Sequence, residues 1–555
     1  MSSDGDIIAV ENSMHDNLTE ASTVHFSDKN FTYITDSTSN SGSFQSGQIQ
    51  FDLSTLASQS QWINLSEAVI EFPVKITSTL TSAVATTAAI NTAIIKNGWH
   101  QWIDSCQVVI NGQTVQSSQT YENVAAQFRI LSSWSQDTLK KFGSSCGFSL
   151  DDCTNSETST SYATINGLNN ATASTVMNNV RGFDATNQQN VIFNKGTQAR
   201  MTMTNNDIAA TSLQGAILGN ASMRQSATSN VASAGSKSAV NDALYSGFFM
   251  ATVRLKDICD INEFPLVKNL KGYVYLTFNS ASLTVSTGAS NLVSNGSVAV
   301  QILSGRTCPI LLNTTSSGIN TANTSYVINA TVDGTSTGAV GASGPLLTSA
   351  RLLVPYYVAN PKTDLALSKS NKFFTTLEKI VNPIVATAGS SVNYTITVGV
   401  PNPRKLLLLP MWQNLGGATY LTNPEVSPFD TVPATSGPFA QLSNLQVYLA
   451  NKPVYQYPLQ YTYEQWINEN SNLGLNGSLV NESTSGLLTQ QLFQQNHSFY
   501  AVDLSRRAES ANGSSQSVQV SFTNPSSTYG MKVIAIVWYE KQWVIETSTC
   551  TLSSV

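Results

Sequence analysis

The sequence has little charge. Asp, Glu, Lys and Arg together make up 11% of its 555 residues, against about 25% in an ordinary globular domain. Hydrophobic residues reach 41%, so hydroxyl and amide side chains must cover the surface. Charged helix formers are scarce, whereas Thr, Val, Tyr and Ile suit strands and Ser, Asn and Gly suit turns. The composition therefore predicts a mostly β protein.

Long apolar runs are also missing. No run reaches 18 apolar residues, and the opening MSSDGDIIAVENSMHD lacks a positively charged region followed by an apolar one, so we expect a soluble chain that is not exported. Six cysteines are widely scattered, at positions 106, 146, 153, 259, 308 and 550. A chain of this length can form two domains of about 200–250 residues, or three smaller ones, without disulfides. We therefore expect free thiols.

The usual signatures of chemistry are absent as well. The four histidines, at positions 15, 25, 100 and 497, show no H-E-x-x-H pair and no zinc-type spacing with cysteine, and we expect them on surfaces or in loops. Ser145 in GSSCG matches G-x-S-x-G, a motif that needs a strand before the serine and a helix after it. Here a helical pattern precedes Ser145 and an acidic, loop-like segment follows it. The sequence predicts no enzyme, with no catalytic, metal-ligating or cofactor-binding residue and no cofactor.

Three weaker patterns have ordinary structural explanations. Asp151-Asp152 could join a calcium site, but an isolated acidic pair is more often a solvated turn. Arg404-Lys405 and Arg506-Arg507 are small basic clusters, for which salt bridges within or between subunits are favoured over nucleic acid. The aromatic segment Trp538–Trp543 could be a glycan platform, but the alternation of IAIVWYEKQWVIE favours a pair of core strands.

Negative charge is concentrated at the start of the chain. In the first 45 residues a single lysine, Lys29, faces seven acidic residues, namely Asp4, Asp6, Glu11, Asp16, Glu20, Asp28 and Asp36. We expect residues 1–45 to be an acidic polar arm rather than core. Such an arm cannot be a basic nucleic-acid-binding tail.

Strand patterns begin after this arm. In WIDSCQVVINGQTVQ two β-rich runs flank Asn111-Gly112, which predicts a tight hairpin. Val124, Phe128 and Leu131 then recur at helical spacing, which predicts a short helix packed on a sheet. Residues 154–240 and 311–345 are loop-like, and we expect a large insertion and a linker or loop there.

Four phrases recur in the same order in the two halves of the chain. SEAVIEFPVKI (66–76) is matched with TSARLLVPYYV (348–358) through Pro73 and Pro355. Gln107-Val108 is matched with Gln446-Val447, Tyr121-Glu122 with Tyr463-Glu464, and KGYVYLTFNSAS with QSVQVSFTNPSS. This order predicts a duplicated β domain, with copies at 46–305 and 346–555 joined by residues 306–345. Insertions of unequal length are compatible with duplication because the entropy of loop closure grows slowly with length.

The segments WIDSCQVVINGQTVQSSQTYENVAAQFRIL, DICDINEFPLVKNLKGYVYLTF, NPRKLLLLPMW and SPFDTVPATSGPFAQLSNLQVYLANKPVYQYPL carry a family resemblance, as do FYAVDLSRRAES, SVQVSFTN and MKVIAIVWYEKQWVIE. In these segments, about half of the chain, the sequence resembles the double jelly-roll major capsid proteins, in particular those of virophages and polinton-like viruses. The insertions at 154–240 and 311–345 match nothing in that pattern.

The resemblance implies an all-β fold of two tandem jelly-roll sandwiches with long loop insertions and a few short helices. It also implies a major capsid protein of a DNA virus, whose homotrimers form pseudo-hexameric capsomers of an icosahedral virion assembled inside the host cell. Its partners would be other copies of the chain, penton proteins and minor capsid proteins. No specific nucleic-acid binding is expected, and the polar loops are candidates for host contact.

Two other functions fit the same composition. A secreted β-rich adhesin or carbohydrate-binding protein would also favour Thr, Asn, Ser and aromatic residues, although no signal peptide is visible. A glycoside hydrolase on a β-sandwich would need two carboxylates facing a cleft, and the sequence offers no persuasive pair.

Overall fold

The computed structural model describes the chain in separate ranges. These ranges are 25–37, 44, 48–57, 61–81, 93–150, 243–261, 264–286, 297–312, 325–335, 349–369, 371–413, 423, 425–426, 428, 440–472, 486–495, 499–505, 514–547 and 551–554. The predicted insertion at 154–240, the pair Asp151-Asp152 and the pair Arg506-Arg507 lie outside the described residues, as does most of 311–345.

The first half of the chain forms two main antiparallel sheets. The strands of the larger sheet are β1 (Phe26–Thr35), β3 (Trp62–Ile63), β4 (Val69–Leu80), β8 (Ala243–Arg254), β10 (Ser280–Ser286), β11 (Ser297–Ser304), β13 (Ser325–Val332) and β14 (Arg351–Ala359). The strands of the smaller sheet are β2 (Gln48–Asp52), β6 (Ile103–Ile110), β7 (Gln113–Gln116) and β9 (Gly272–Phe278), in the order β2-β9-β6-β7. A separate pair joins β5 (Ala93–Ile95) to β12 (Ile310–Leu312).

The second half repeats this arrangement with fewer additions. One sheet has the order β15-β22-β17-β20, with β23 (Thr551–Ser554) paired to β22, and the other has the order β16-β21-β18-β19. The bounds of these strands are β15 (Lys372–Ala386), β16 (Ser391–Val400), β17 (Pro403–Gln413), β18 (Ser443–Leu449), β19 (Lys452–Pro453), β20 (Tyr500–Asp503), β21 (Gln516–Thr523) and β22 (Gly530–Glu546).

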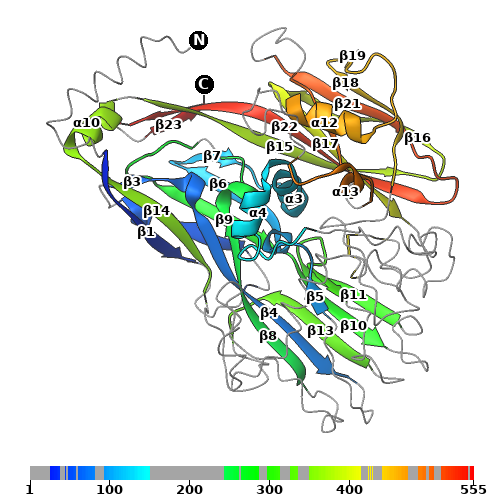
Figure 1. The fold of residues 1–555 in the computed structure, drawn as a ribbon, viewed down its shortest axis with the longest axis horizontal. Coiled ribbons are helices and arrows are strands. Elements are labelled where there is room, and N and C mark those ends of the chain that lie inside the picture. Colours follow the sequence, from blue (N-terminus) through cyan, green and yellow to red (C-terminus); the bar gives the residue numbers. More distant parts are fainter. Residues whose placement is uncertain are drawn as a thin grey trace.

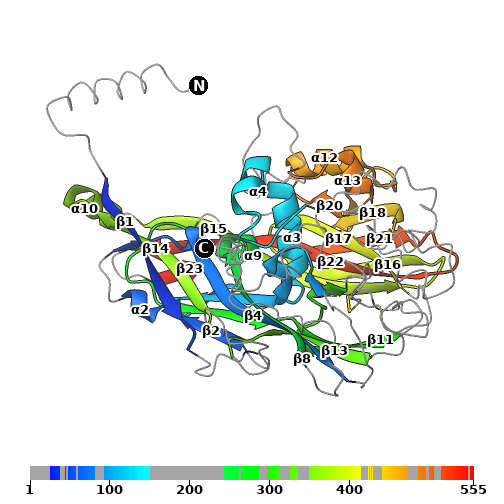
Figure 2. The same ribbon diagram turned by 60° about the horizontal axis from the view of Figure 1, so that its bottom comes forward.

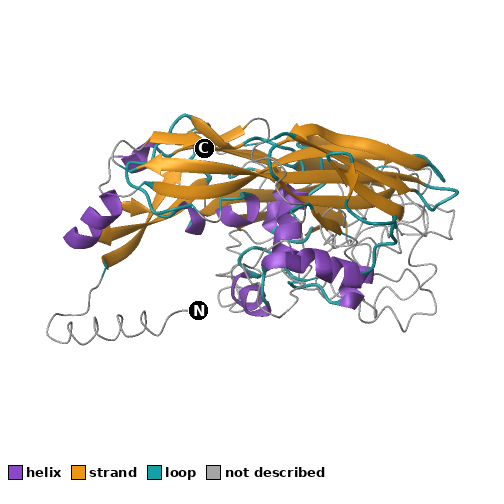
Figure 3. Cartoon of the chain, turned by 90° about the horizontal axis from the view of Figure 1, so that it is seen from above, coloured by secondary structure: helices purple, strands orange, loops and turns teal. Residues whose placement is uncertain are grey.

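Short helices connect the strands. They are α2 (Ser54–Ala57), α3 (Glu122–Ser133), α4 (Gln136–Phe142), α9 (Leu255–Ile258), α10 (Pro361–Lys369), α12 (Tyr463–Asn472), α13 (Gln490–Gln495) and the 3-10 turns η1 (Leu65–Glu67) and η2 (Trp99–Trp102). Most of the helices lie on one side of the layered strands (Figure 3).

Both halves have the strand order of a jelly roll. If the eight main strands of each half are lettered B to I along the chain, the first half has the sheets β1-β14-β4-β8 and β2-β9-β6-β7. The second half has β15-β22-β17-β20 and β16-β21-β18-β19. Each half is therefore a B-I-D-G sheet facing a C-H-E-F sheet, which is the jelly-roll form of the β-sandwich. The predicted fold class, two tandem jelly rolls, is confirmed by this strand order.

Three of the four recurring phrases mark equivalent positions. Gln107-Val108 lies in β6 and Gln446-Val447 in β18, which are the two E strands. KGYVYLTFNSAS and QSVQVSFTNPSS contain the two H strands, β9 and β21. Glu122 and Tyr463 begin α3 and α12, which both lie between strands F and G. These three matches reflect the duplicated fold.

The remaining match, that of Pro73 with Pro355, is wrong. Pro73 lies in β4, a D strand, whereas Pro355 lies in β14, an I strand, and the two strands pair with each other in one sheet. The topological equivalent of β4 is β17, which contains Pro410. An apolar strand with a proline is too common a pattern to separate strand D from strand I.

The expected division of the chain also needs correction at two places. Strand β1, inside the expected arm 1–45, pairs along its length with β14. Strands β13 and β14, placed by sequence in the linker and in the second copy, lie end to end along β4 and together fill the I position of the first roll. In a jelly roll the last strand, I, lies between strands B and D. Strand β14 takes this place between β1 and β4, so the first roll ends after β14.

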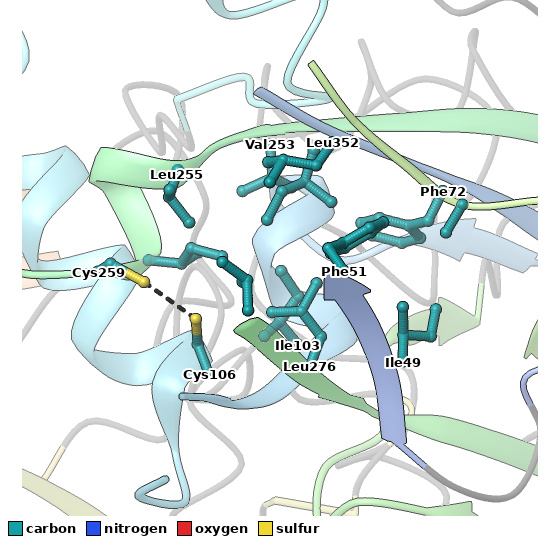
Figure 4. Packing of buried hydrophobic residues seen from close by; sticks show 14 of the residues in the cluster. Ile49, Phe51, Phe72, Ile103, Cys106, Val253, Leu255, Cys259, Leu276 and Leu352 are labelled. Carbon is teal, nitrogen blue, oxygen red and sulfur yellow. Dashed lines mark hydrogen bonds between the residues drawn. The ribbon is translucent and has the colours of Figure 1, made fainter. Parts of the chain in front are cut away.

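Alternate side chains of the two facing sheets fill the core of the first roll. Phe51 and Leu276 come from the C-H-E-F sheet, and Phe72 and Leu352 come from the B-I-D-G sheet, all fully buried (Figure 4). The sequence pattern of strand β9, with alternate buried residues, is that of a strand with one face in this core. The core of the second roll is built in the same way from β16, β17, β18, β21 and β22.

The predicted hairpin forms at Asn111-Gly112, where both residues have positive φ angles of 49° and 82°. Strand β9 begins nearby at Gly272, whose φ is 150° and where an added Cβ would lie 2.0 Å from the carbonyl oxygen of Val109. Only glycine allows β9 to pair with β6 at this point.

We predict that Gly272→Ala lowers the free energy of unfolding by about 2–4 kcal/mol, since it adds a steric clash to an unfavourable backbone angle. The matched control is Gly112→Ala, where the added Cβ meets nothing within 4 Å and only the backbone term of about 1 kcal/mol remains. Urea unfolding of the two variants checks the difference, and equal losses of stability would contradict the close packing at Gly272.

Candidate functional site: the junction between the two jelly rolls

Helix α3 of the first roll covers one sheet of the second roll. With α4, it lies near the centre of the molecule, where the strands of the two rolls come together (Figure 1). The helical side chains predicted to face a sheet, Val124, Phe128 and Leu131, are fully buried in one cluster with Leu407, Leu409, Ile534 and Ile536 of the second roll. The sequence predicted the helix and its apolar face correctly, but not that the sheet belongs to the other half of the chain.

An aromatic cluster forms the centre of this contact. The ring of Phe128 lies 5.9 Å from that of Trp466 and 5.9 Å from that of Trp538, and 6.1 Å from that of Phe499. Aromatic pairs at such separations contribute about 0.5–1.5 kcal/mol each beyond their buried area. Residues from α3, α12 and β22 are therefore held together at one point, and α12 and α13 lie beside α4 on the same side of the strands (Figure 2).

The B-I-D-G sheet of the second roll is buried on both faces as a result. In β17, Leu406 and Leu408 point into the sandwich core, while Leu407 and Leu409 point to α3. Strand β22 alternates in the same way between the two clusters. The continuous apolar runs LLLLPMW and VIAIVW are the sequence signal of such a strand, and they could have revealed the junction.

A buried charge network crosses the same junction. The guanidinium of Arg129 donates to both carboxylate oxygens of Asp260, at 2.8 and 2.6 Å, and to Glu122 at 3.0 Å. Glu122 also pairs with Lys379 of β15, and the indole nitrogen of Trp538 donates to Asp260 at 3.0 Å. All of these side chains are buried, so the two rolls share one set of charged hydrogen bonds.

The network fixes the charge state of its members. Burial alone would raise the pKa of Asp260, but the adjacent Arg129 guanidinium lowers it to about 2. For Arg129, burial opposes the charged form, but Asp260 and Glu122 outweigh burial and raise the pKa above its usual value. Asp260 and Arg129 are therefore both charged at every physiological pH.

Lys405 is the unusual member of this region. It is only 3% exposed, and among the described residues its ammonium group has no ion-pair or hydrogen-bond partner. It faces the rings of Trp538 and Phe128, with Nζ 4.6 and 5.6 Å from their centroids. Burial, reinforced by the charges of Arg129 and Lys379 and opposed by Asp260, lowers the pKa of Lys405 to about 8.

A second polar contact joins the two halves nearby. The hydroxyl of Tyr121, the residue that precedes α3, donates to Glu425 at 2.9 Å, and Lys532 of β22 pairs with the same carboxylate. Tyr121 has a left-handed backbone with φ of 60°. Burial and the neighbouring Glu425 raise the pKa of Tyr121, which keeps its hydroxyl a donor.

The residues considered from sequence as chemical candidates lie apart from one another. Ser145 lies in a turn after α4 rather than between a strand and a helix. His25 is exposed and contacts Thr363, while His15 and His497 lie outside the described residues. Within the described ranges, no three or more His, Cys, Asp and Glu side chains are grouped as a metal site would need.

The expectation for His100 is wrong, because this histidine is buried. One ring nitrogen lies 2.7 Å from the side-chain oxygen of Gln127, and burial lowers its pKa to about 4. His100 is the second residue of the 3-10 turn η2, which packs against α3. It is therefore a neutral hydrogen-bonded core residue, which sequence spacing alone does not distinguish from a loop histidine.

The remaining sequence expectations are met in part. Arg404 pairs with Glu540 within the second roll, but Lys405 makes no salt bridge to any residue that the structure describes. Trp538 and Trp543 are buried core residues, as predicted, although they lie on one long strand rather than on a strand pair.

The thiols that the structure describes are free and buried. These are Cys106, Cys146, Cys259 and Cys308, and the sulfur atoms of Cys106 and Cys259 lie 2.9 Å apart (Figure 4). Cys153 and Cys550 lie outside the described ranges. In those ranges no helix has the length and apolar content needed to cross a membrane.

Comparison with known proteins found similarity only at the level of structure. No family model and no curated protein sequence matches the chain. Among solved structures, the chain is similar to the mavirus major capsid protein, with 13% identity over 97% of this chain and 92% of that one, at a TM-score of 0.46. It is also similar to a chain of the Sputnik virophage, with 11% identity, coverage of 96% and 90%, and a TM-score of 0.47.

A third solved structure, the Faustovirus major capsid protein, is 9% identical, with coverage of 94% of this chain and 91% of that chain and a TM-score of 0.43.

We predict that Arg129→Met lowers the free energy of unfolding by about 3–5 kcal/mol, because it leaves the carboxylates of Asp260 and Glu122 buried without their partner. The matched control is Arg404→Met, which breaks an ion pair whose arginine is 35% exposed and should cost less than about 1 kcal/mol. Denaturant unfolding measures both, and an equally small effect at the two sites would contradict the buried network.

We predict the opposite effect for Lys405→Met measured at pH 7 in chloride buffer, with a gain on the order of 2–3 kcal/mol. Because the pKa of Lys405 falls from 10.5 to about 8 on folding, the unfolded chain binds more protons between these values and wild-type stability rises with pH there. The gain should therefore be largest below pH 8 and shrink towards pH 10.5. A loss of stability that does not change with pH would contradict the assignment.

Proposed function

We propose that this chain is a major capsid protein whose homotrimers form pseudo-hexameric capsomers of an icosahedral shell. The observation that carries the proposal is the doubling itself, two jelly rolls of identical strand order in one chain. Three copies arranged about a threefold axis present six similar sandwiches, and units with six-cornered outlines tile a surface. A single-domain binding protein has no use for this doubling.

The junction suits the same role. The angle between the two rolls sets whether three copies close into a regular six-cornered ring, so this angle must not vary between copies. The buried network of Arg129, Asp260, Glu122 and Lys379 and the aromatic cluster at Phe128 join the rolls into one unit. We infer that the junction acts as the rigid element of the capsomer.

Exposed apolar side chains on both B strands support contact between subunits. Phe31 and Tyr33 on β1 and Phe373 and Val385 on β15 are each more than half exposed, and β1 and β15 are outer strands of their sheets. Monomeric proteins rarely leave large apolar residues on edge strands, because such edges promote association. We propose that both strands are buried between chains. They would be part of an obligate interface, and such interfaces bury roughly 2,000–5,000 Å².

The proposal places the chain in the virion, after assembly inside the host cell, with penton and minor capsid proteins as further partners. With a net charge of −6 and an acidic first segment, the chain should confine a genome without binding it tightly. Residues 154–240, and the parts of 311–345 that lie outside β12 and β13, are our candidates for host contact.

The first test is the oligomeric state of the purified chain. Mass photometry should give a particle of three times the 59.5 kDa chain mass, and negative-stain microscopy should show a six-cornered outline. The double variant Phe31→Asp/Phe373→Asp should raise the concentration at which trimers dissociate at least about tenfold, since it places charge in an apolar interface.

The matched control is Tyr457→Asp, which replaces an equally exposed aromatic residue outside the B strands and should leave the trimer intact. A stable wild-type monomer that binds glycans would reject the capsid proposal in favour of a carbohydrate-binding protein. Tight DNA binding with a steep dependence on salt would contradict the expected lack of contact with the genome.

A further inference from the structure

A polar pocket of about 510 Å³ opens at the edge of the junction. The first roll supplies residues from α3, α4, α9 and η1, and the second roll supplies Leu377 of β15 and Lys405 of β17. Glu67 and Ser133 on its wall are exposed, whereas Lys405 and Asp260 are buried. The pocket therefore leads from the surface to the buried network and exists only where the two rolls meet.

Among the described residues, Lys405 is the buried cation of this pocket that has no hydrogen-bond or ion-pair partner. Its ammonium can donate three hydrogen bonds, and within the described part of the chain it donates none. Its two aromatic neighbours, Trp538 and Phe128, interact with the cation but accept no conventional hydrogen bond. A buried ammonium without an acceptor is costly, so its orientation towards a pocket calls for an explanation.

The carboxylates in the pocket are already engaged. Asp260 pairs with Arg129 through both oxygens. Asp257 pairs with Arg254 at 2.8 and 2.9 Å. Glu67 pairs with Lys29, which lies outside the pocket lining. None of these acids is left to neutralise Lys405.

The buried charges do not balance. Asp257 is neutralised by Arg254. Of the other charges in the network, Arg129, Lys379 and Lys405 contribute three positive charges and Glu122 and Asp260 contribute two negative ones, which leaves one uncompensated positive charge beside the pocket. Lys256 adds a further positive charge to the lining. One bound anion would restore neutrality.

We propose that this pocket binds a small anionic ligand, with the Lys405 ammonium donating to a phosphate or carboxylate oxygen at the junction of the two rolls. The volume exceeds that of a bare ion, so a small organic phosphate or carboxylate also fits. Bound there, the anion would contact both rolls and neutralise Lys405, so it would stabilise their mutual arrangement by binding the folded state only.

The probes are inorganic phosphate and acetate, each titrated calorimetrically into the purified full-length chain in chloride of matched ionic strength. Phosphate should bind at one site per chain, and Lys405→Met should weaken binding at least about tenfold, since a charge-assisted hydrogen bond is lost. Lys140→Met, which removes an exposed lysine of α4 outside the pocket lining, should bind as wild type does. Competition by acetate would identify a carboxylate site, and its absence a phosphate site.

A second measurement needs no variant. N-hydroxysuccinimidyl acetate modifies unprotonated lysine amines, and peptide mass spectrometry reports each lysine separately. Saturating phosphate should slow the modification of Lys405 and leave that of Lys140 unchanged. This protection tests the site even if Lys405→Met fails to fold.

Equal phosphate binding by wild type and Lys405→Met would show an adventitious ion only and would overturn the proposal, as would a folded wild-type chain that binds neither probe. The proposal concerns the junction within one chain, so it does not depend on the oligomeric state.

Discussion

The fold of this chain depends on how the apolar surface of the second roll is covered. A B-I-D-G sheet that carries leucine, isoleucine and tryptophan on both faces cannot be left open to water, and α3 of the first roll buries the outer face. Since that burial also removes Arg129, Asp260, Glu122 and Lys379 from solvent, the charges must pair with one another. Apolar burial supplies the attraction between the rolls, and the ion pairs select one arrangement.

Equivalent elements of the two rolls make different contacts. In the first roll the helix between strands F and G reaches across to the other roll, whereas in the second roll the equivalent helix α12 packs beside it on the same cluster through Trp466. The I strand of the first roll is split into β13 and β14. One topology thus tolerates long additions at the connections, because the sandwich core needs only the eight paired strands.

How much could be predicted from the sequence depended on how local each signal was. The Asn111-Gly112 hairpin and the helical spacing of Val124, Phe128 and Leu131 are set by neighbouring residues, and both were predicted correctly. Strand identity was not, as the mistaken match of Pro73 with Pro355 shows, because β4 and β14 have similar composition and differ only in what they pair with. The burial of His100 was also missed, because it depends on packing against Gln127 of α3 and not on the residues next to His100 in the sequence.

The sequence by itself determined the β class, the presence of two related halves and the free state of the described thiols, since composition, ordered repeats and cysteine spacing are properties of the chain alone. Only the tertiary structure decided where the first roll ends, which sheet α3 covers and that Lys405 is buried against two aromatic rings. Those three facts are contacts between residues far apart in the chain. Such contacts are selected by the packing of whole sheets, which no short segment encodes.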